Sequence, residues 1–343
     1  MRKLLYIFLI LALGCSKPKN TTTSNDLVAE LLKGNVKLVR EIDYAVIIKF
    51  DSIIKDHIGP SGTFLDLNRE SKYNTSGMLI ASVNYNNNNI ITSEYTYEYD
   101  EFGNFIRESI HQKKDSTSYS NIPERNTRNE MKYDNNSNKV EMTWYHSDRL
   151  KSKNTYKYDS RGNIIEQNEY FDDGSLSVKS VYEYLDGNNL RIIDYNSKGQ
   201  ITKEVTNCFD NNGKKIDVFT NYFWTDTRIT YRYDKQGNEI ERNEFKENNK
   251  LTYKKESEYD LNGRIIFTIE TFPGTNINYS RYKYDSKGNL KEQKVTYEDE
   301  RLIPVTYTNS FIYDKQQNWI KKISYRNFMP EKITERKIIY YQI

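Results

Sequence analysis

Hydrophobic and polar residues alternate with a period of two along most of the chain after about residue 70. Tyr95, Tyr97 and Tyr99 fall on one side of such a segment, whereas Thr96 and Glu98 fall on the other. Because successive side chains of a β-strand point to opposite faces, this alternation predicts strands with a tyrosine face and a charged face. The same alternation returns in later segments, so the sequence predicts an all-β fold.

An aromatic–Asp step followed by turn residues interrupts the strand pattern at regular intervals. The stretches "YKYDSRGNII", "YRYDKQGNEI" and "YKYDSKGNLK" are close copies of one another. From Tyr133 onward, the steps between successive copies are 25, 26, 25, 24, 26, 25 and 29 residues, and a period this steady indicates a repeat architecture. The copies are Tyr99-Asp100, Tyr133-Asp134, Tyr158-Asp159, Phe209-Asp210, Tyr233-Asp234, Tyr259-Asp260, Tyr284-Asp285 and Tyr313-Asp314, with weaker ones at Tyr73-Asn74 and Tyr184-Leu185.

Each copy carries the residues of a tight hairpin turn. The Asp can accept a hydrogen bond from the backbone N–H two residues on, and the Gly suits a left-handed position in a bulged loop. Ser137 and Gln317 replace that Gly in two copies, so we expect those turns to be looser or differently shaped. The residues to which we assign this structural role are Asp159, Gly162, Asp234, Gly237, Asp285 and Gly288.

A second, less regular turn falls about midway through each period, as in "FDDGSL" from Phe171 and "YNSKGQI" from Tyr195. Two strands and two turns per period can run only as an antiparallel meander. One hairpin cannot bury its aromatic face alone, so the repeats are expected to cover one another. We therefore predict an antiparallel meander of about twenty strands, forming a long twisted sheet that curls toward its tyrosine face.

The first residues have the features of an export signal. Arg2 and Lys3 precede the apolar run "LLYIFLILAL", which is too short to span a bilayer comfortably. The run ends in "LALGC", which resembles the lipobox of bacterial lipoproteins, although Ala12 stands where Leu is usual. The resemblance implies that Cys15 becomes the lipidated first residue of the mature protein. An ordinary cleaved signal or an uncleaved N-terminal anchor are the alternatives.

These features divide the chain into four parts. They are a signal peptide (1–14), a lipidated Cys with a polar tether (15–35), an N-terminal cap strand and linker (36–72) and the repeat domain (73–343). We expect a short helical turn before Gly34 and one strand from Val36 to about Ile48. The insertion 111–129 lengthens one repeat step and is expected to be a mobile loop.

The pattern YxYDxxGN followed by a strand resembles the YD repeats of Rhs-type proteins. Together with the lipobox, it resembles the small YD-repeat lipoproteins of Gram-negative envelopes. This resemblance covers roughly residues 70 to 325 and implies a lipid-anchored location in the cell envelope, at the outer membrane. The chain departs from the large Rhs shells because its ten or so repeats are too few to close a large shell, and we expect no further domain after them.

Catalytic and metal-binding patterns are weak in this sequence. His57, His111 and His146 are scattered, and acylation of Cys15 would leave Cys208 without a partner, so no catalytic constellation, disulfide framework or Cys-based zinc site is expected. The stretches "DNNSN" and "DNNG" lack the alternating ligands and final Glu of a calcium loop and fit turns better. We therefore expect no enzyme activity, no metal and no cofactor.

Composition and charge point to a binding role. Hydrophobic residues make up 36% of the chain but aromatic ones 14%, and removal of the signal's two cations lowers the formal net charge from +3 to +1, which gives no reason to expect nucleic acid. Trp144, Trp224 and Trp319 would form a platform for sugar rings or a protein partner, unless these rings simply pack on cross-strand neighbours.

We expect a noncatalytic cell-envelope lipoprotein that acts as a binding or scaffold module for a glycan, an envelope polymer or a protein partner. The alternative, implied by the association of Rhs-type proteins with polymorphic toxins, is an immunity-type or toxin-associated protein. A neighbouring toxin gene would favour this alternative, whereas an envelope or polysaccharide gene cluster would favour the binding module.

Overall fold

A computed structural model of the chain describes residues 26–59, 68–114, 123–185, 189–222, 225–247 and 249–342. This described part holds one short helix, α1 (Asp26–Ala29), and 23 strands, which confirms the all-β prediction. The strands are β1 (Val36–Lys49), β2 (Ser52–Ile58), β3 (Asn68–Tyr73), β4 (Leu79–Tyr85), β5 (Ile91–Tyr99), β6 (Phe105–Gln112), β7 (Arg125–Tyr133), β8 (Lys139–His146), β9 (Arg149–Tyr158), β10 (Ile164–Phe171), β11 (Leu176–Leu185), β12 (Asn189–Asn196), β13 (Ile201–Phe209), β14 (Lys215–Tyr222), β15 (Asp226–Tyr233), β16 (Glu239–Lys246), β17 (Lys250–Tyr259), β18 (Ile265–Phe272), β19 (Asn276–Tyr284), β20 (Leu290–Tyr297), β21 (Val305–Tyr313), β22 (Trp319–Arg326) and β23 (Met329–Tyr340).

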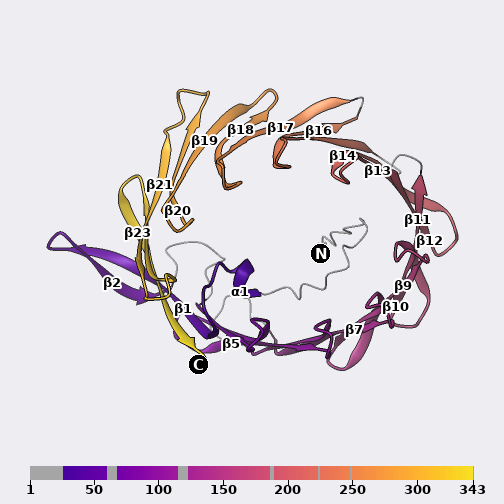
Figure 1. Ribbon diagram of the computed structural model, residues 1–343, viewed down its shortest axis with the longest axis horizontal. Helices are drawn as coiled ribbons and strands as arrows, with labels where there is room; N and C mark the ends of the chain where they lie inside the picture. Colours follow the sequence, from indigo (N-terminus) through magenta and orange to yellow (C-terminus); the bar gives the residue numbers. More distant parts are fainter. Residues whose placement is uncertain are drawn as a thin grey trace.

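From β3 to β23, each strand pairs antiparallel with the next one in sequence, as the meander prediction requires. The two ends of this meander are not left apart, as they would be in an open sheet. β1 pairs antiparallel with β23, from Val36 opposite Tyr340 to Ala45 opposite Lys332, and its other edge pairs with β3. The sheet therefore closes into a single-layered ring of 22 strands, with β2 attached to the far end of β1 (Figure 1).

The prediction of a long open, curled sheet was wrong. The closing strand β1 lies outside the repeat pattern, and its partner β23 is almost 300 residues away in sequence. A period of about 25 residues indicates which strands are neighbours within the meander, but it carries no information on whether the two ends meet. The expected helical turn and the strand that begins at Val36 are confirmed by α1 and β1.

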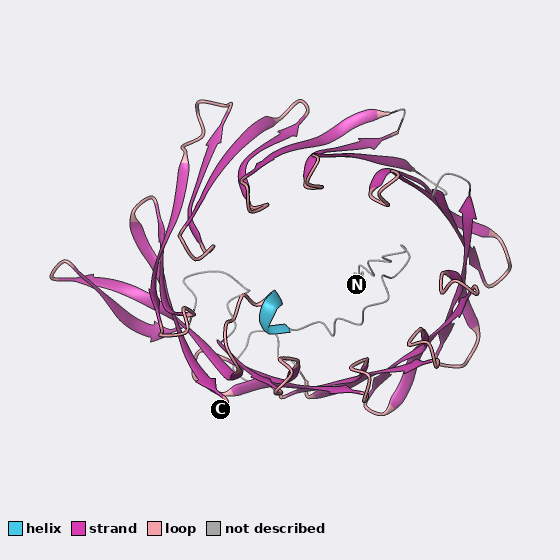
Figure 2. Cartoon of the chain, in the orientation of Figure 1, coloured by secondary structure: helices cyan, strands magenta, loops and turns pink. Residues whose placement is uncertain are grey.

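The turns of the aromatic–Asp copies lie along one rim of the ring and hook inward, whereas the other turns extend outward (Figure 2). Gly162, Gly237 and Gly288 have φ of 84°, 89° and 91°, which confirms the left-handed position. Ser137 and Gln317 adopt the same conformation, with φ of 60° and 68°, and donate the same N–H to the turn Asp as the glycines do. The expectation of looser turns there was wrong. The hydrogen bonds of the turn hold the backbone of these two residues in the left-handed region, although this region is unfavourable for residues other than Gly.

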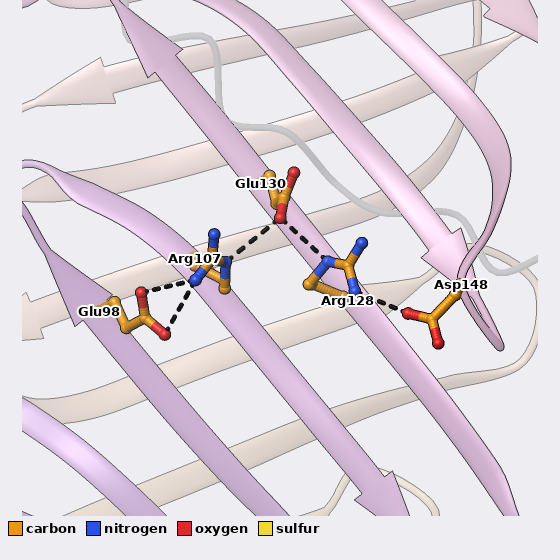
Figure 3. Close-up of polar contacts among 5 residues, drawn as sticks. All are labelled: Glu98, Arg107, Arg128, Glu130 and Asp148. Carbon is orange, nitrogen blue, oxygen red and sulfur yellow. Dashed lines mark hydrogen bonds and ion pairs between the residues drawn. The ribbon is translucent and has the colours of Figure 1, made fainter.

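The charged face of the wall points outward and the tyrosine face points inward. Figure 3 shows Glu98, Arg107 and Glu130 on the near surface of their strands, with the opposite wall behind them. Tyr97 and Tyr99 flank Glu98 and so lie on the inner face. The outer face is crossed by ion pairs, among them Arg107 with Glu98 at 2.9 Å and with Glu130 at 3.2 Å.

The buried core is small and lies beside α1, inside the ring (Figures 1 and 2). Leu27 and Leu32 pack there against Val36, Val39 and Tyr73. Elsewhere a single layer of strands leaves most side chains half-buried, so amphipathic tyrosines replace a thick apolar core. No helix in the described ranges has the length and apolar character to cross a membrane.

Candidate functional site

In most copies, the tyrosine of the aromatic–Asp step joins successive repeats. The Tyr158 hydroxyl donates to the backbone carbonyl of Lys139 at 2.7 Å, and Lys139 is the first strand residue after the preceding turn. Because the same bond recurs in seven repeats, we assign these tyrosines a structural role. The donors and acceptors are Tyr99 to Leu79, Tyr133 to Phe105, Tyr158 to Lys139, Tyr184 to Ile164, Tyr233 to Lys215, Tyr259 to Glu239 and Tyr284 to Ile265.

Burial favours the neutral form of these tyrosines. It raises the pKa of Tyr99 and of Tyr233 to about 12, with smaller contributions from nearby acidic groups. The hydroxyl groups therefore remain protonated, and remain donors, throughout the physiological pH range. These residues hold the wall together and supply no titratable group for catalysis.

The place where the ring closes, formed by β1, β3 and β23, is called the seam below. The segment that carries α1 crosses its inner side. The backbone N–H of Leu79 donates to the Asp26 carboxylate at 2.6 Å. The Asn318 side chain accepts from the N–H of Lys33 and donates to its carbonyl, both at 2.8 Å. This segment thus joins the turn before β4 to the turn before β22.

A cavity of about 400 Å³ lies beside this segment. Lys33, Lys287, Arg336 and Glu30 contribute charged groups to its lining, and Trp319 contributes an aromatic ring. Arg336 stacks on that ring at 3.5 Å from its centroid and pairs with Glu41 at 2.6 Å. The cavity therefore combines excess positive charge with aromatic surface.

Two hairpins at the seam expose large apolar side chains. Phe50, at the tip of the β1–β2 hairpin, is 99% exposed, and Phe328, at the tip of the β22–β23 hairpin, is 81% exposed. Their φ angles are 49° and 67°, which a bulky side chain rarely adopts. Beyond their last pair, Ala45 with Lys332, β1 and β23 both extend toward the same rim of the ring. The two hairpin tips are therefore on neighbouring hairpins. The β1–β2 hairpin stands out from the ring (Figure 1).

The structure separates the tryptophans of the predicted aromatic platform. Trp144 lies on β8, opposite Asn129, and is 40% exposed, whereas Trp319 lies on β22 under Arg336. These strands belong to different walls of the ring, between the labelled β7 and β9 and between β21 and β23 (Figure 1). Trp224 lies outside the described residues, as does Cys15, and lipidation of Cys15 stays a prediction.

The insertion 111–129, expected to be a loop, is strand at both ends. The insertion forms the end of β6 and the start of β7, and residues 115–122 lie outside the described part. Within the described ranges, the titratable side chains form no cluster that would hold a metal ion. Cys208 is a free thiol on β13.

Sequence reasoning missed the seam hairpins and the cavity. The stretches "KFDS" and "RNFM" connect strands through two residues without Gly, which was an available signal of strained turns. No comparable signal marked the cavity, because its lining comes from positions that are about 300 residues apart.

Comparison with known proteins yields no family. No protein-family model matches the chain, and no curated protein matches it. Among solved structures, the chain is similar to the Photorhabdus luminescens Tc holotoxin pore, at 12% identity and a TM-score of 0.31, over 78% of this chain and 19% of that one. It thus spans a fifth or less of the length of the Tc toxin chains that it matches.

Two porin-like proteins are also similar to this chain. The one from Bacteroides uniformis is 10% identical, with a TM-score of 0.34 over 90% of this chain and 99% of that one. The one from Bacteroides vulgatus is 11% identical, with a TM-score of 0.23 over 55% of this chain and 94% of that one. These likenesses fit the repeated β-structure of the chain, and they carry no argument about its function.

Proposed function

We propose that the protein is a noncatalytic binding or scaffold module of the cell envelope, related to YD-repeat lipoproteins and held by a lipid on Cys15. Its partner is a glycan, an envelope polymer or another protein. The observation that carries this proposal is the pair of exposed phenylalanines on the seam hairpins. A left-handed conformation of a bulky residue costs of order 1–3 kcal/mol and is retained mostly where function requires the side chain.

Phe50 and Phe328 do not stabilise the fold. Both side chains extend into solvent, so neither contributes to the core. Asn or Gly would adopt the same backbone conformation with less strain. Exposed aromatic side chains are frequent anchors of protein interfaces, where burial of a large flat ring supplies much of the binding energy.

A pull-down from envelope fractions, with the full chain in detergent, tests the proposal. The double variant Phe50→Asn/Phe328→Gly should keep or raise the melting temperature and should lose the bound partners. Leu261→Asn, which removes a fully exposed apolar side chain at the opposite rim, is the matched control and should retain them. Recovery of the same partners with the double variant would refute this binding surface.

The proposed membrane location is tested separately. Replacement of Cys15 by Ser removes the thiol that would carry the lipid, so metabolic lipid labelling should disappear and the protein should leave the membrane fraction. A Cys15→Ser variant that stays membrane-bound would contradict lipid anchoring through this residue. The immunity-type alternative is tested separately by the gene neighbourhood.

A further inference from the structure

Two aromatic residues flank a small residue on the inner face of the wall formed by β8, β9 and β10. Trp144 of β8 lies opposite Ser152 of β9, and Phe171 of β10 lies opposite the same serine from the other side. Ser152 shares the inner face with Tyr156 and Tyr158, because an even number of residues separates them along the strand. Each strand lies about 4.8 Å from the next, so the backbones of the two aromatic residues are roughly 10 Å apart and leave room for a ligand between the rings.

The fold does not require these two rings. Trp144 is 40% exposed and Phe171 is 53% exposed, and in the described ranges neither ring packs on another ring or on a cation. The repeat formed by β14, β15 and β16 carries Thr220, Thr227 and Lys246 at the equivalent positions, and these three residues lie opposite one another in the same way. The wall therefore forms equally well without aromatic residues at these positions.

A carboxylate without a cation lies beside the rings. Glu169 precedes Phe171 by two residues on β10, so it points to the same face, and it is exposed. At the equivalent position of the β14–β16 repeat, Glu244 forms an ion pair with Arg242 at 2.6 Å. Gln167 replaces this arginine on β10, and Glu169 has no ion-pair partner among the residues that the structure describes.

The strand register adds a second carboxylate near the rings. The row of paired residues that holds Trp144 continues over Asn129 to Glu108, which accepts a hydrogen bond from the Asn129 side chain at 2.9 Å. Arg149 belongs to the next pair on the same face, nearer the rim. The aromatic pair is thus flanked by Glu108 on one side and by Glu169 on the other, and this arrangement is complementary to a cation.

We propose that Trp144, Phe171 and Glu169 bind an organic ammonium group, as carried by an amino sugar or by a choline headgroup. The faces of aromatic rings attract cations, and a carboxylate adds Coulomb attraction and can accept hydrogen bonds from a primary ammonium group. The space over Ser152 holds the carbon atoms that carry the nitrogen.

This site is separate from the seam hairpins, because it lies on β8 to β10 in a different part of the ring (Figure 1). The inference therefore goes beyond the proposed function and does not depend on the exposed phenylalanines of the hairpins.

Isothermal titration at low salt, with the full chain in a nonionic detergent, tests the inference. The probes are glucosamine and choline, each with a neutral analogue: glucose for the first, and the alcohol in which carbon replaces the choline nitrogen for the second. At a pH that keeps glucosamine protonated, at least one ammonium compound should bind about fivefold or more tightly than its neutral analogue. The tighter of the two identifies the ligand as an amino sugar or a choline headgroup.

Matched variants assign the binding to this site. Trp144→Thr copies Thr220 of the other repeat and should weaken the ammonium compound by about fivefold or more. Glu169→Gln should weaken it by about threefold or more. Both side chains are exposed, so the melting temperature should stay unchanged. Glu258→Gln is the control, because it removes an exposed carboxylate of the outer face, and it should bind as the wild type does.

The double variant of the seam hairpins should also bind normally, so a failure of this inference is distinguishable from a failure of the proposed function. Three results would overturn the inference. The first is the absence of binding for both ammonium compounds. The second is binding of the neutral analogues as tightly as the ammonium compounds. The third is equal weakening by Glu169→Gln and by Glu258→Gln, which would show that only the overall charge matters.

Discussion

At the scale of single residues, the aromatic–Asp turn depends on one carboxylate and one left-handed position. Asp159 accepts hydrogen bonds from the backbone N–H of Arg161 and of Asn163 at 2.9 and 2.8 Å, while Gly162 donates to its carbonyl at 3.0 Å. The Asn163 side chain adds a bond of 2.9 Å to the second carboxylate oxygen. One side chain thus satisfies three donors of a five-residue turn.

Gly237→Val should lower the free energy of unfolding by about 1–3 kcal/mol, because a β-branched residue is forced to a φ near 89°. Its Cβ would also displace the side chain of Lys214, which packs over that glycine. Gly237→Asn is the control and should cost less, since Asn tolerates the left-handed region. Denaturant unfolding measures both, and equal losses would contradict the backbone explanation.

The turn carboxylates should make stability fall in acid. Hydrogen bonds from Asn163, Asn238 and Arg264 hold the pKa values of Asp159, Asp234 and Asp260, respectively, below the ordinary value. Because the folded pKa is lower than the unfolded one of about 3.9, this stabilisation is complete above pH 4 to 5 and is lost as the pH falls through the folded values.

Thermal unfolding between pH 7 and pH 2 measures this loss. The triple variant Asp159→Asn/Asp234→Asn/Asp260→Asn keeps the acceptors but does not titrate, as Asn74 does naturally in the first turn. Its melting temperature should therefore fall less between pH 5 and pH 2 than that of the wild type. Parallel pH profiles would exclude a contribution from these turns.

At the scale of the repeat, the tyrosine hydroxyls join neighbouring hairpins in addition to the backbone ladder. Each bond reaches from the end of one hairpin to the strand that follows the preceding turn. Phe209 occupies the tyrosine position in one copy and lacks the hydroxyl, so the wall tolerates the loss of one such bond. The repeat therefore distributes its stability over many modest contacts.

Tyr158→Phe should lower the free energy of unfolding by about 1 kcal/mol, because it removes the bond to Lys139 and keeps the ring. Tyr195→Phe is the matched control, since Tyr195 lies on the outer face of β12 and the structure gives its hydroxyl no hydrogen bond. Equal effects of the two substitutions on the denaturation midpoint would argue against the inter-repeat role.

At the scale of the whole molecule, the seam is the part that decides closure. β1 belongs to no repeat, yet it completes the ring by pairing with both β23 and β3. The segment from Asp26 to Lys33 then joins the turns before β4 and before β22, which lie on either side of β1. Asn318, only 3% exposed, binds that segment and also donates to the Tyr340 hydroxyl at 2.8 Å.

Asn318→Ala should lower the free energy of unfolding by about 1–3 kcal/mol, since it leaves backbone groups of Lys33 without their partner. Hydrogen exchange should accelerate in β1 and β23 and stay unchanged in β9 to β15. Asn163 occupies the turn position in the wall that Asn318 occupies at the seam. The control Asn163→Ala should leave exchange at the seam unaffected. Uniform acceleration around the ring would mean that the seam does not open independently.

The sequence by itself determined the strands, the turns and their order. Alternation over two residues, the aromatic–Asp step and the turn glycines act over a few neighbours, so they can be recognised without knowledge of the rest of the chain. The positive φ of Gly162, Gly237 and Gly288 and the two hairpin turns per period were predictable for this reason.

Only the tertiary structure decided closure, the separation of Trp144 from Trp319 and the two candidate sites. Closure depends on the total twist and curvature summed over more than twenty strands, and a small difference per strand separates an open sheet from a ring. The pairing of β1 with β23 and the cavity between Lys33, Lys287 and Arg336 join residues that are far apart in sequence. No local pattern encodes such contacts, because they arise from the geometry of the whole ring.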